Sequence, residues 1–152
     1  MLRHEFTVDM DIDFAVCFPC LCSPQSFFSS SPYTHKVRKL DEKGELYEVV
    51  FKWRKLGITR YYPVKLRVER RPGKDKVEII YKSTEDSKYD FYLSLVVRRI
   101  GPGKVRVHCL SYMRAGLMAD LLGRKEYKLF VENLVRDGVF CLVERRAVPH
   151  YA

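Results

Sequence analysis

The sequence predicts an α+β fold, with one antiparallel sheet of seven strands and a long C-terminal helix. Apolar and polar residues alternate near the N-terminus and again over roughly eighty residues after Pro32, which is typical of half-buried strands. From Ala115 the apolar residues recur at intervals of three and four, the spacing of an amphipathic helix. At 152 residues and 47% apolar content, the chain is expected to form a single domain over residues 1–152.

The first 31 residues predict one strand followed by two short helices. A half-buried strand is predicted over residues 4–13, because Glu, Thr and Asp residues occupy every second position there. The positions between them form the other side of the strand: His4, Phe6, Val8, Met10 and Ile12. Pro19 and Pro24 then interrupt an apolar stretch, which predicts two short helices within residues 14–31. Asp13 is expected to cap the first helix, and Ser23 the second.

Six further strands are predicted near residues 34–41, 45–54, 58–70, 76–83, 88–100 and 103–113. The connectors between them are short, so neighbouring strands must run antiparallel. The alternation predicts an apolar inner face: Tyr47, Val49, Phe51, Trp53, Tyr62, Val64, Leu66, Val68, Val77, Ile79, Tyr81, Phe91, Leu93, Leu95, Val97, Val105, Val107, Cys109 and Met113. It also predicts a charged outer face: Glu48, Lys52, Arg54, Lys65, Arg67, Glu78, Lys82, Arg98 and Arg106.

The C-terminal helix is predicted to run from Ala115 to about Arg146. A helix of this length would cross the whole sheet. Gly123 and Gly138 lie within it, and a glycine permits a bend or a close approach to a neighbouring element.

This order of elements resembles the helix-grip fold of the START and birch-pollen-allergen superfamily, over nearly the whole chain. Local features add to the resemblance: the Asp13 helix entry, the Ser23-Pro24 step with Phe27 and Phe28, Pro32 before the second strand, and the closing helix. The resemblance implies a curved sheet wrapped around the long helix. It also implies a cavity between the two that takes lipids, sterols, quinones, polyketides or other apolar ligands.

The large rings of the inner face would either line such a cavity or fill the core. Buried tyrosine hydroxyls need hydrogen-bond partners, which favours a space that holds water or a polar ligand head. The predicted ligand-binding residues are Tyr47, Phe51, Trp53, Tyr62, Leu66, Tyr81, Phe91, Leu93, Met113, Met118 and Leu122.

An acidic ligand would also need a cation, because a buried carboxylate is costly unless it is paired. By alternation, Arg60 shares a face with Tyr62, Arg99 with Val97, and His4 with Phe6. We favour Arg60 or Arg99, since a guanidinium binds a carboxylate through two parallel hydrogen bonds. The alternative is that each of these side chains emerges into solvent at a strand end.

Three of the five cysteines fall within six positions: Cys17, Cys20 and Cys22. Cys17-Phe18-Pro19-Cys20 matches a thioredoxin-like redox motif, but that fold needs parallel strands. A zinc site would need a fourth ligand at a suitable spacing, so we expect no metal and no cofactor. Packing is the leading interpretation. The helix-grip resemblance further implies that Cys141 lies near this cluster, which predicts a disulfide to one of the three.

The net charge of +9 permits two other functions. The basic outer face, with Tyr61, Tyr92 and Tyr112, is typical of RNA-binding or anionic-surface-binding modules. Interleaved carboxylates favour a solvated, salt-bridged face instead. The superfamily also includes cyclase- or dehydratase-like enzymes, but we find no acid–base pair. Glu126 is the one carboxylate in the helix that could point inward, and a solvated helix face is the favoured interpretation for it.

We therefore expect non-enzymatic binding or carriage of a lipid, a long-chain fatty acid or another amphipathic small molecule. No specific nucleic-acid partner is expected, and contact with anionic membranes would be transient. The opening segment lacks a basic n-region and no apolar run is long enough to span a membrane, which favours a cytoplasmic protein. The high charge content and the single Asn and Gln favour a thermophilic source.

Overall fold

The computed structural model describes residues 1–114 and 116–142, apart from the side chains of residues 117–122. Its elements follow the chain in this order: β1 (Leu2–Met10), α1 (Phe14–Leu21), α2 (Pro24–Ser29), β2 (Thr34–Lys39), β3 (Leu46–Lys55), β4 (Ile58–Gly73), β5 (Lys76–Ser83), β6 (Asp90–Gly101), β7 (Lys104–Arg114) and α3 (Leu117–Val139). The strands form one antiparallel sheet, in the order β1-β7-β6-β5-β4-β3-β2. The predicted α+β class and seven-stranded sheet are confirmed.

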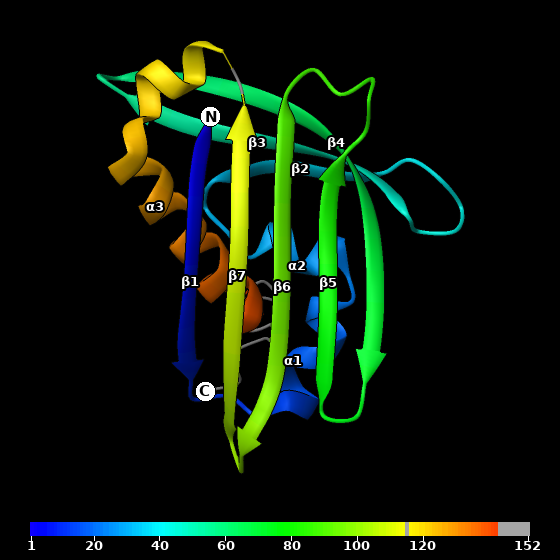
Figure 1. Ribbon diagram of the computed structural model, residues 1–152. Helices are drawn as coiled ribbons and strands as arrows, with labels where there is room; N and C mark the ends of the chain where they lie inside the picture. The colour runs from blue at the N-terminus through cyan, green and yellow to red at the C-terminus, as the bar shows by residue number, and fades with distance from the viewer. Residues whose placement is uncertain (115, 143–152) are drawn as a thin grey trace, which may run out of the picture.

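The sheet is curved, and the helices lie on its inner side (Figure 1). Strands β2 to β7 follow one another as hairpins, because their connectors are too short for crossovers. The first strand instead pairs with the last, with Leu2 opposite Met113 and Met10 opposite Val105. Strand β4 runs to Gly73, beyond the predicted end at residue 70, because Arg70 to Gly73 pair with β5.

The core lies between the inner face of the sheet and the helices. Every residue predicted for the inner face of β3 to β7 is buried, except Trp53, which is half-buried. The prediction for the first strand is wrong at Val8, which is 39% exposed. The physical reason is that β1 is an edge strand. It has β7 on one side and no strand on its other side in the described sheet.

The outer face carries charged side chains as predicted, and many of them form ion pairs. Arg38 lies 3.4 Å from Glu48, Lys65 lies 2.7 Å from Asp86, and Arg106 lies 2.8 Å from Asp9. Two of the outer tyrosines, Tyr92 and Tyr112, stack on each other with ring centroids 4.6 Å apart. The outer face therefore has the salt-bridged character that its interleaved carboxylates predict.

The two short helices differ in how they begin. Ser23 caps α2, since its hydroxyl accepts a hydrogen bond from the Ser26 N–H at 3.3 Å. Asp13 is the N-cap residue of α1, as predicted, but its side chain makes no capping hydrogen bond. The backbone carbonyl of Asp13 accepts from Val16 and Cys17 instead.

Helix α3 is shorter than predicted and is divided by a kink. It begins at Leu117 and ends at Val139, where Cys141 takes a positive φ of 53°; the predicted segment after residue 142 lies outside the described residues. Gly123 has φ 65° and ψ 172°, so the expected bend at this glycine is confirmed. Gly138 also permits a close approach, but to Phe27 of α2 and not to the sheet.

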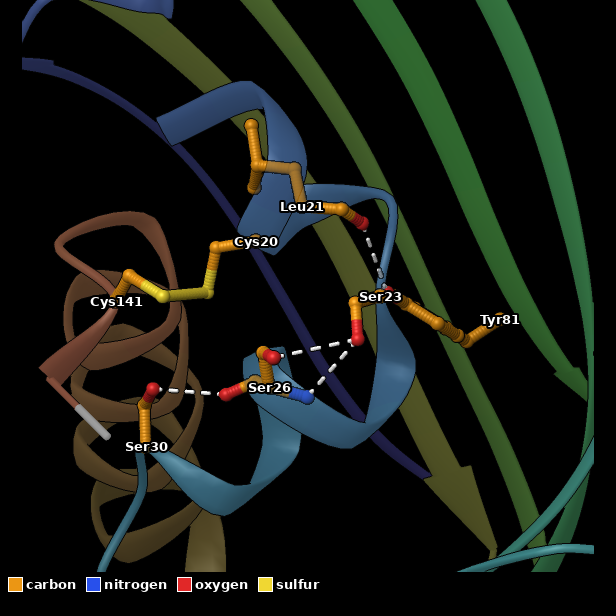
Figure 2. Close-up of a disulfide and its surroundings, with 7 residues drawn as sticks. All are labelled: Cys20, Leu21, Ser23, Ser26, Ser30, Tyr81 and Cys141. Carbon is orange, nitrogen blue, oxygen red and sulfur yellow. Dashed lines mark hydrogen bonds between the residues drawn. A yellow bond between two sulfur atoms is a disulfide. The ribbon is translucent and has the colours of Figure 1, made fainter. Parts of the chain in front are cut away.

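A disulfide joins Cys20 in α1 to Cys141 just after α3, with Cα atoms 5.9 Å apart (Figure 2). The prediction that Cys141 pairs with one of the three clustered cysteines is confirmed, and the partner is Cys20. Cys17 and Cys22 remain thiols. Near the bond, the Tyr81 hydroxyl donates to the Leu21 carbonyl at 3.4 Å, which ties α1 to the sheet.

Candidate ligand-binding groove

A groove of about 860 Å³ lies between α3 and the end of β3. It exists because β2 pairs with β3 only from Thr34, opposite Phe51, so the end of β3 has no strand beside it on that side in the described part of the chain. Its apolar and aromatic lining comes from Tyr33, Trp53, Tyr61 and Leu129. Its polar lining includes Arg54, Lys55, Glu126 and Asp137.

Trp53 is held in the groove by aromatic rings on several sides. Its ring centroid lies 4.7 Å from Phe130, 5.1 Å from Tyr62 and 6.0 Å from Phe51. Phe130 comes from α3 and lies 5.3 Å from Phe51 as well. Helix α3 and strand β3 therefore meet through these rings, and Phe51 is part of the packed core.

The indole nitrogen of Trp53 is a buried donor without an acceptor among the described residues. Leaving a buried N–H unpaired costs about 1 to 3 kcal/mol, so most such groups in proteins are satisfied. The ring is fixed by its neighbours and cannot turn its nitrogen outward without losing those contacts. An acceptor from outside the protein would remove this cost.

Tyr62 and Arg60 lie next to Trp53. Arg60 is the cross-strand partner of Trp53, and Tyr62 pairs with Phe51. Burial raises the pKa of Tyr62, while the positive charge of Arg60 opposes this rise. The Arg60 side chain is exposed, so it stands at the margin of this aromatic cluster and not inside it.

The two predicted cations are far apart on the sheet. Arg99 is exposed, pairs with Val105 near the β6–β7 hairpin, and donates its backbone N–H to the Asp75 carbonyl. Arg60 lies near the β3–β4 hairpin, at the opposite end of the strands (Figure 1). Of the two, Arg60 is the one that pairs with a groove residue, Trp53, although Arg60 does not itself line the groove.

The other predicted ligand-binding residues lie elsewhere on the inner face. Tyr81 packs beneath α2, with its ring centroid 4.8 Å from that of Phe28. Phe91 lies 5.2 Å from Phe51 and pairs with Met113. Further residues are buried in the core: Tyr47, Leu66 and Leu93. The side chains of Met118 and Leu122 lie outside the described residues.

A buried polar pair that the sequence interpretation missed connects α3 to the sheet. The Ser111 hydroxyl donates to the Tyr92 carbonyl at 2.8 Å, so Tyr127 donates its hydroxyl hydrogen to Ser111 at 2.7 Å. Burial raises the pKa of Tyr127 above its ordinary range. The signal for this pair was present, because Ser111 is a polar residue on the inner-face alternation between Cys109 and Met113.

The structure exposes one carboxylate of α3 and buries another. Glu126 is exposed and lies 4.0 Å from Lys55, in agreement with the favoured interpretation of a solvated helix face. Asp137 is the buried one, and it lies 3.8 Å from Arg136. The spacing predicts this placement, since Asp137 follows Leu134 by three residues and precedes Cys141 by four.

In the described part of the chain, no three His, Cys, Asp or Glu side chains come together as a metal site. Nor does any helix there have the length and apolar character needed to cross a membrane.

The fold is shared with solved structures at low sequence identity. A START superfamily protein from Mycobacterium smegmatis aligns with a TM-score of 0.63 at 11% identity, covering 95% of this chain and 98% of that one. The protein TTHA0849 from Thermus thermophilus aligns with a TM-score of 0.64 at 8% identity, covering 94% and 98%. The Zhui aromatase/cyclase from Streptomyces sp. R1128 aligns with a TM-score of 0.56 at 15% identity, covering 99% and 98%.

These similarities confirm the helix-grip fold that the order of elements predicts. At such identities they concern the fold alone. No protein-family model matches the sequence, and no curated protein matches it either.

Proposed function

We propose that this protein binds an amphipathic small molecule without transforming it. The apolar body would lie against the rings around Trp53, and the polar head would lie in the groove beside α3. The observation that carries the proposal is the buried Trp53 Nε1, which has a hydrogen to donate and no acceptor among the described residues. An oxygen of the ligand would accept this hydrogen bond. The fold shared with a START superfamily protein supports an apolar ligand class.

A long-chain acid is the ligand class that the charges favour. Its carboxylate would accept from Trp53 Nε1 and pair with Arg60, which lies opposite Trp53 in the β3–β4 pairing. Arg60 forms no ion pair with any residue that the structure describes, so its charge is available to a ligand. We therefore assign the cationic role to Arg60 and not to Arg99.

The first test removes the donor while keeping an aromatic ring. We expect Trp53→Phe to weaken binding of a long-chain fatty acid by about ten- to a hundredfold, the range for a lost hydrogen bond to a charged group. Displacement of a fluorescent apolar probe by the acid measures this affinity. A long-chain hydrocarbon without an acceptor serves as the control ligand, and its affinity should change far less.

The second variant in the same assay is Arg60→Gln, and the matched control is Arg99→Gln at the other end of the sheet. Arg60→Gln should weaken the acid and spare the corresponding alcohol, whereas Arg99→Gln should leave both affinities unchanged. Equal losses for the two arginine variants would contradict the assignment. A wild-type protein that displaces no probe with any acid, alcohol or sterol would contradict the proposed function itself.

Because one of the structural neighbours is an aromatase/cyclase, binding must be distinguished from catalysis. In the described residues, the two groove-lining carboxylates each lie near a cation, Glu126 near Lys55 and Asp137 near Arg136. An ion pair with a neighbouring cation does not position either carboxylate as a general acid or base for a bound substrate. We expect mass spectrometry to recover a copurified or added ligand with its mass unchanged, and turnover to a new product would overturn the non-enzymatic proposal.

A further inference from the structure

The β3–β4 hairpin exposes two aliphatic side chains at its tip. Leu56 is 94% exposed and Ile58 is 58% exposed. The hairpin projects beyond the rest of the sheet, at the end of the molecule where α3 begins (Figure 1). Single exposed apolar residues are common on proteins, but a leucine and an isoleucine on either side of one glycine at a projecting tip need a reason.

The turn itself does not supply that reason. Leu56 and Gly57 form a two-residue loop between the paired residues Lys55 and Ile58, and both have positive φ, 53° and 78°. Such turns strongly favour Asn-Gly or Asp-Gly, because a leucine side chain is disfavoured at positive φ. The Leu56 side chain also buries almost none of its surface. Folding therefore gains nothing from a leucine here and loses turn stability.

The charges around the tip have one sign. Residues 52–61 contain Lys52, Arg54, Lys55 and Arg60 and no carboxylate. Among the described residues, the carboxylate that approaches this set is Glu126, 4.0 Å from Lys55. Arg124 and Lys125, which precede Glu126 in α3, are exposed.

We propose that the β3–β4 tip docks on an anionic phospholipid membrane. Leu56 and Ile58 would enter the boundary between headgroups and acyl chains, and Arg54 and its neighbours would contact lipid phosphates. A stable protein partner would need about 800 Å² of surface on each side, which two side chains do not provide. An RNA partner would use the cations but would leave the aliphatic pair unexplained. This inference goes beyond the proposed small-molecule binding and does not require it.

Cosedimentation with vesicles tests the proposal. We expect the wild-type protein to bind vesicles of mixed phosphatidylcholine and phosphatidylserine more tightly than vesicles of phosphatidylcholine alone. The double variant Leu56→Asn/Ile58→Ser should bind the mixed vesicles at least about tenfold more weakly, since it loses two buried aliphatic side chains. Arg54→Gln should bind about fivefold more weakly, from the loss of one cation near the anionic surface.

Matched controls are available on the same chain. Val16→Ser removes an aliphatic side chain that is 58% exposed on α1, away from the hairpin, and Arg67→Gln removes an exposed cation from the outer face of β4. Neither should change vesicle binding. Asn is favoured in the left-handed turn, so Leu56→Asn alone should fold at least as stably as the wild type. That variant separates lost docking from lost folding.

Three outcomes would overturn the proposal. The first is a wild-type protein that does not bind the mixed vesicles. The second is equal weakening by the tip variants and their controls. The third is binding to single-stranded RNA that competes with the vesicles and depends on Arg54 but not on Leu56 and Ile58. The probe-displacement assay is run on the tip double variant in parallel, where unchanged ligand affinity shows that the two proposals succeed or fail separately.

Discussion

Replacing Cys20 and Cys141 together by alanine is expected to lower the free energy of unfolding by about 4 to 5 kcal/mol. The two residues are 121 positions apart, so the disulfide closes a loop of most of the chain and restricts the unfolded state. The bond also holds the end of α3 against α1 (Figure 2). Urea unfolding of the oxidised wild type and of the double variant measures the loss, which corresponds to about 10 to 20 °C in Tm for a domain of this size.

Two controls make this result specific. Cys22→Ala removes a partly buried thiol from the same cluster and should change stability far less. Alkylation of the denatured protein without reductant should modify three thiols: Cys17, Cys22 and Cys109. Five modified thiols would show that the disulfide is absent. In the native protein Cys17 should react slowly at neutral pH, because burial raises its pKa to about 11.

Gly138→Ala is expected to destabilise the protein by about 3 kcal/mol, the upper part of the usual range for overpacking. A methyl group at this position would overlap the ring of Phe27. That ring cannot move freely, since it lies fully buried between Phe28 and Tyr81, with centroids 5.2 Å and 5.7 Å away. The clash would separate α3 from α2, and chemical unfolding measures its cost.

The matched control is Gly101→Ala, where an added methyl group meets no atom within 4 Å. The mechanism is tested by a double-mutant cycle with Phe27→Leu, a smaller side chain that leaves room for the methyl group. In that background Gly138→Ala should cost less than half as much. Equal costs in both backgrounds would contradict the assignment of the effect to the Phe27 ring.

Most of the sheet could be predicted from the sequence, because one physical rule places its residues. On an antiparallel strand the side chains alternate between the core and solvent, so Val49, Phe51, Leu93 and Leu95 mark the inner face directly. The rule becomes weaker where a strand has one neighbour. Val8 follows the pattern of β1 and is nevertheless exposed, because an edge strand is not covered along its whole length.

The helices were harder to predict, because their limits depend on contacts between elements. Helix α3 ends at Val139, two residues before Cys141, which forms the disulfide with Cys20. No local signal in the sequence gives that end. The burial of Asp137, in contrast, could have been predicted, because its spacing from Leu134 and Cys141 places it on the apolar side of the helix.

The candidate site could be predicted only in part. The alternation identified Trp53 and Tyr62, and the strand register brought Arg60 beside them. The open end of β3 depends on the register of β2 against β3, which the alternation does not specify. The unpaired Trp53 Nε1 depends on the positions of all surrounding acceptors, so only coordinates reveal it. The thermophilic source and cytoplasmic location stay predictions from composition.

The pairing of β1 with β7 affects how the chain folds as it is made. Strand β1 is synthesised before β7, which is its neighbour in the described sheet and ends at Arg114. At a synthesis rate of about 5 to 20 residues per second, roughly 5 to 20 s pass between the synthesis of β1 and that of β7. During this time its backbone N–H and C=O groups are open to other chains. The charged side chains of Arg3, Glu5 and Asp9 on the exposed side of β1 disfavour such pairing until β7 has been synthesised.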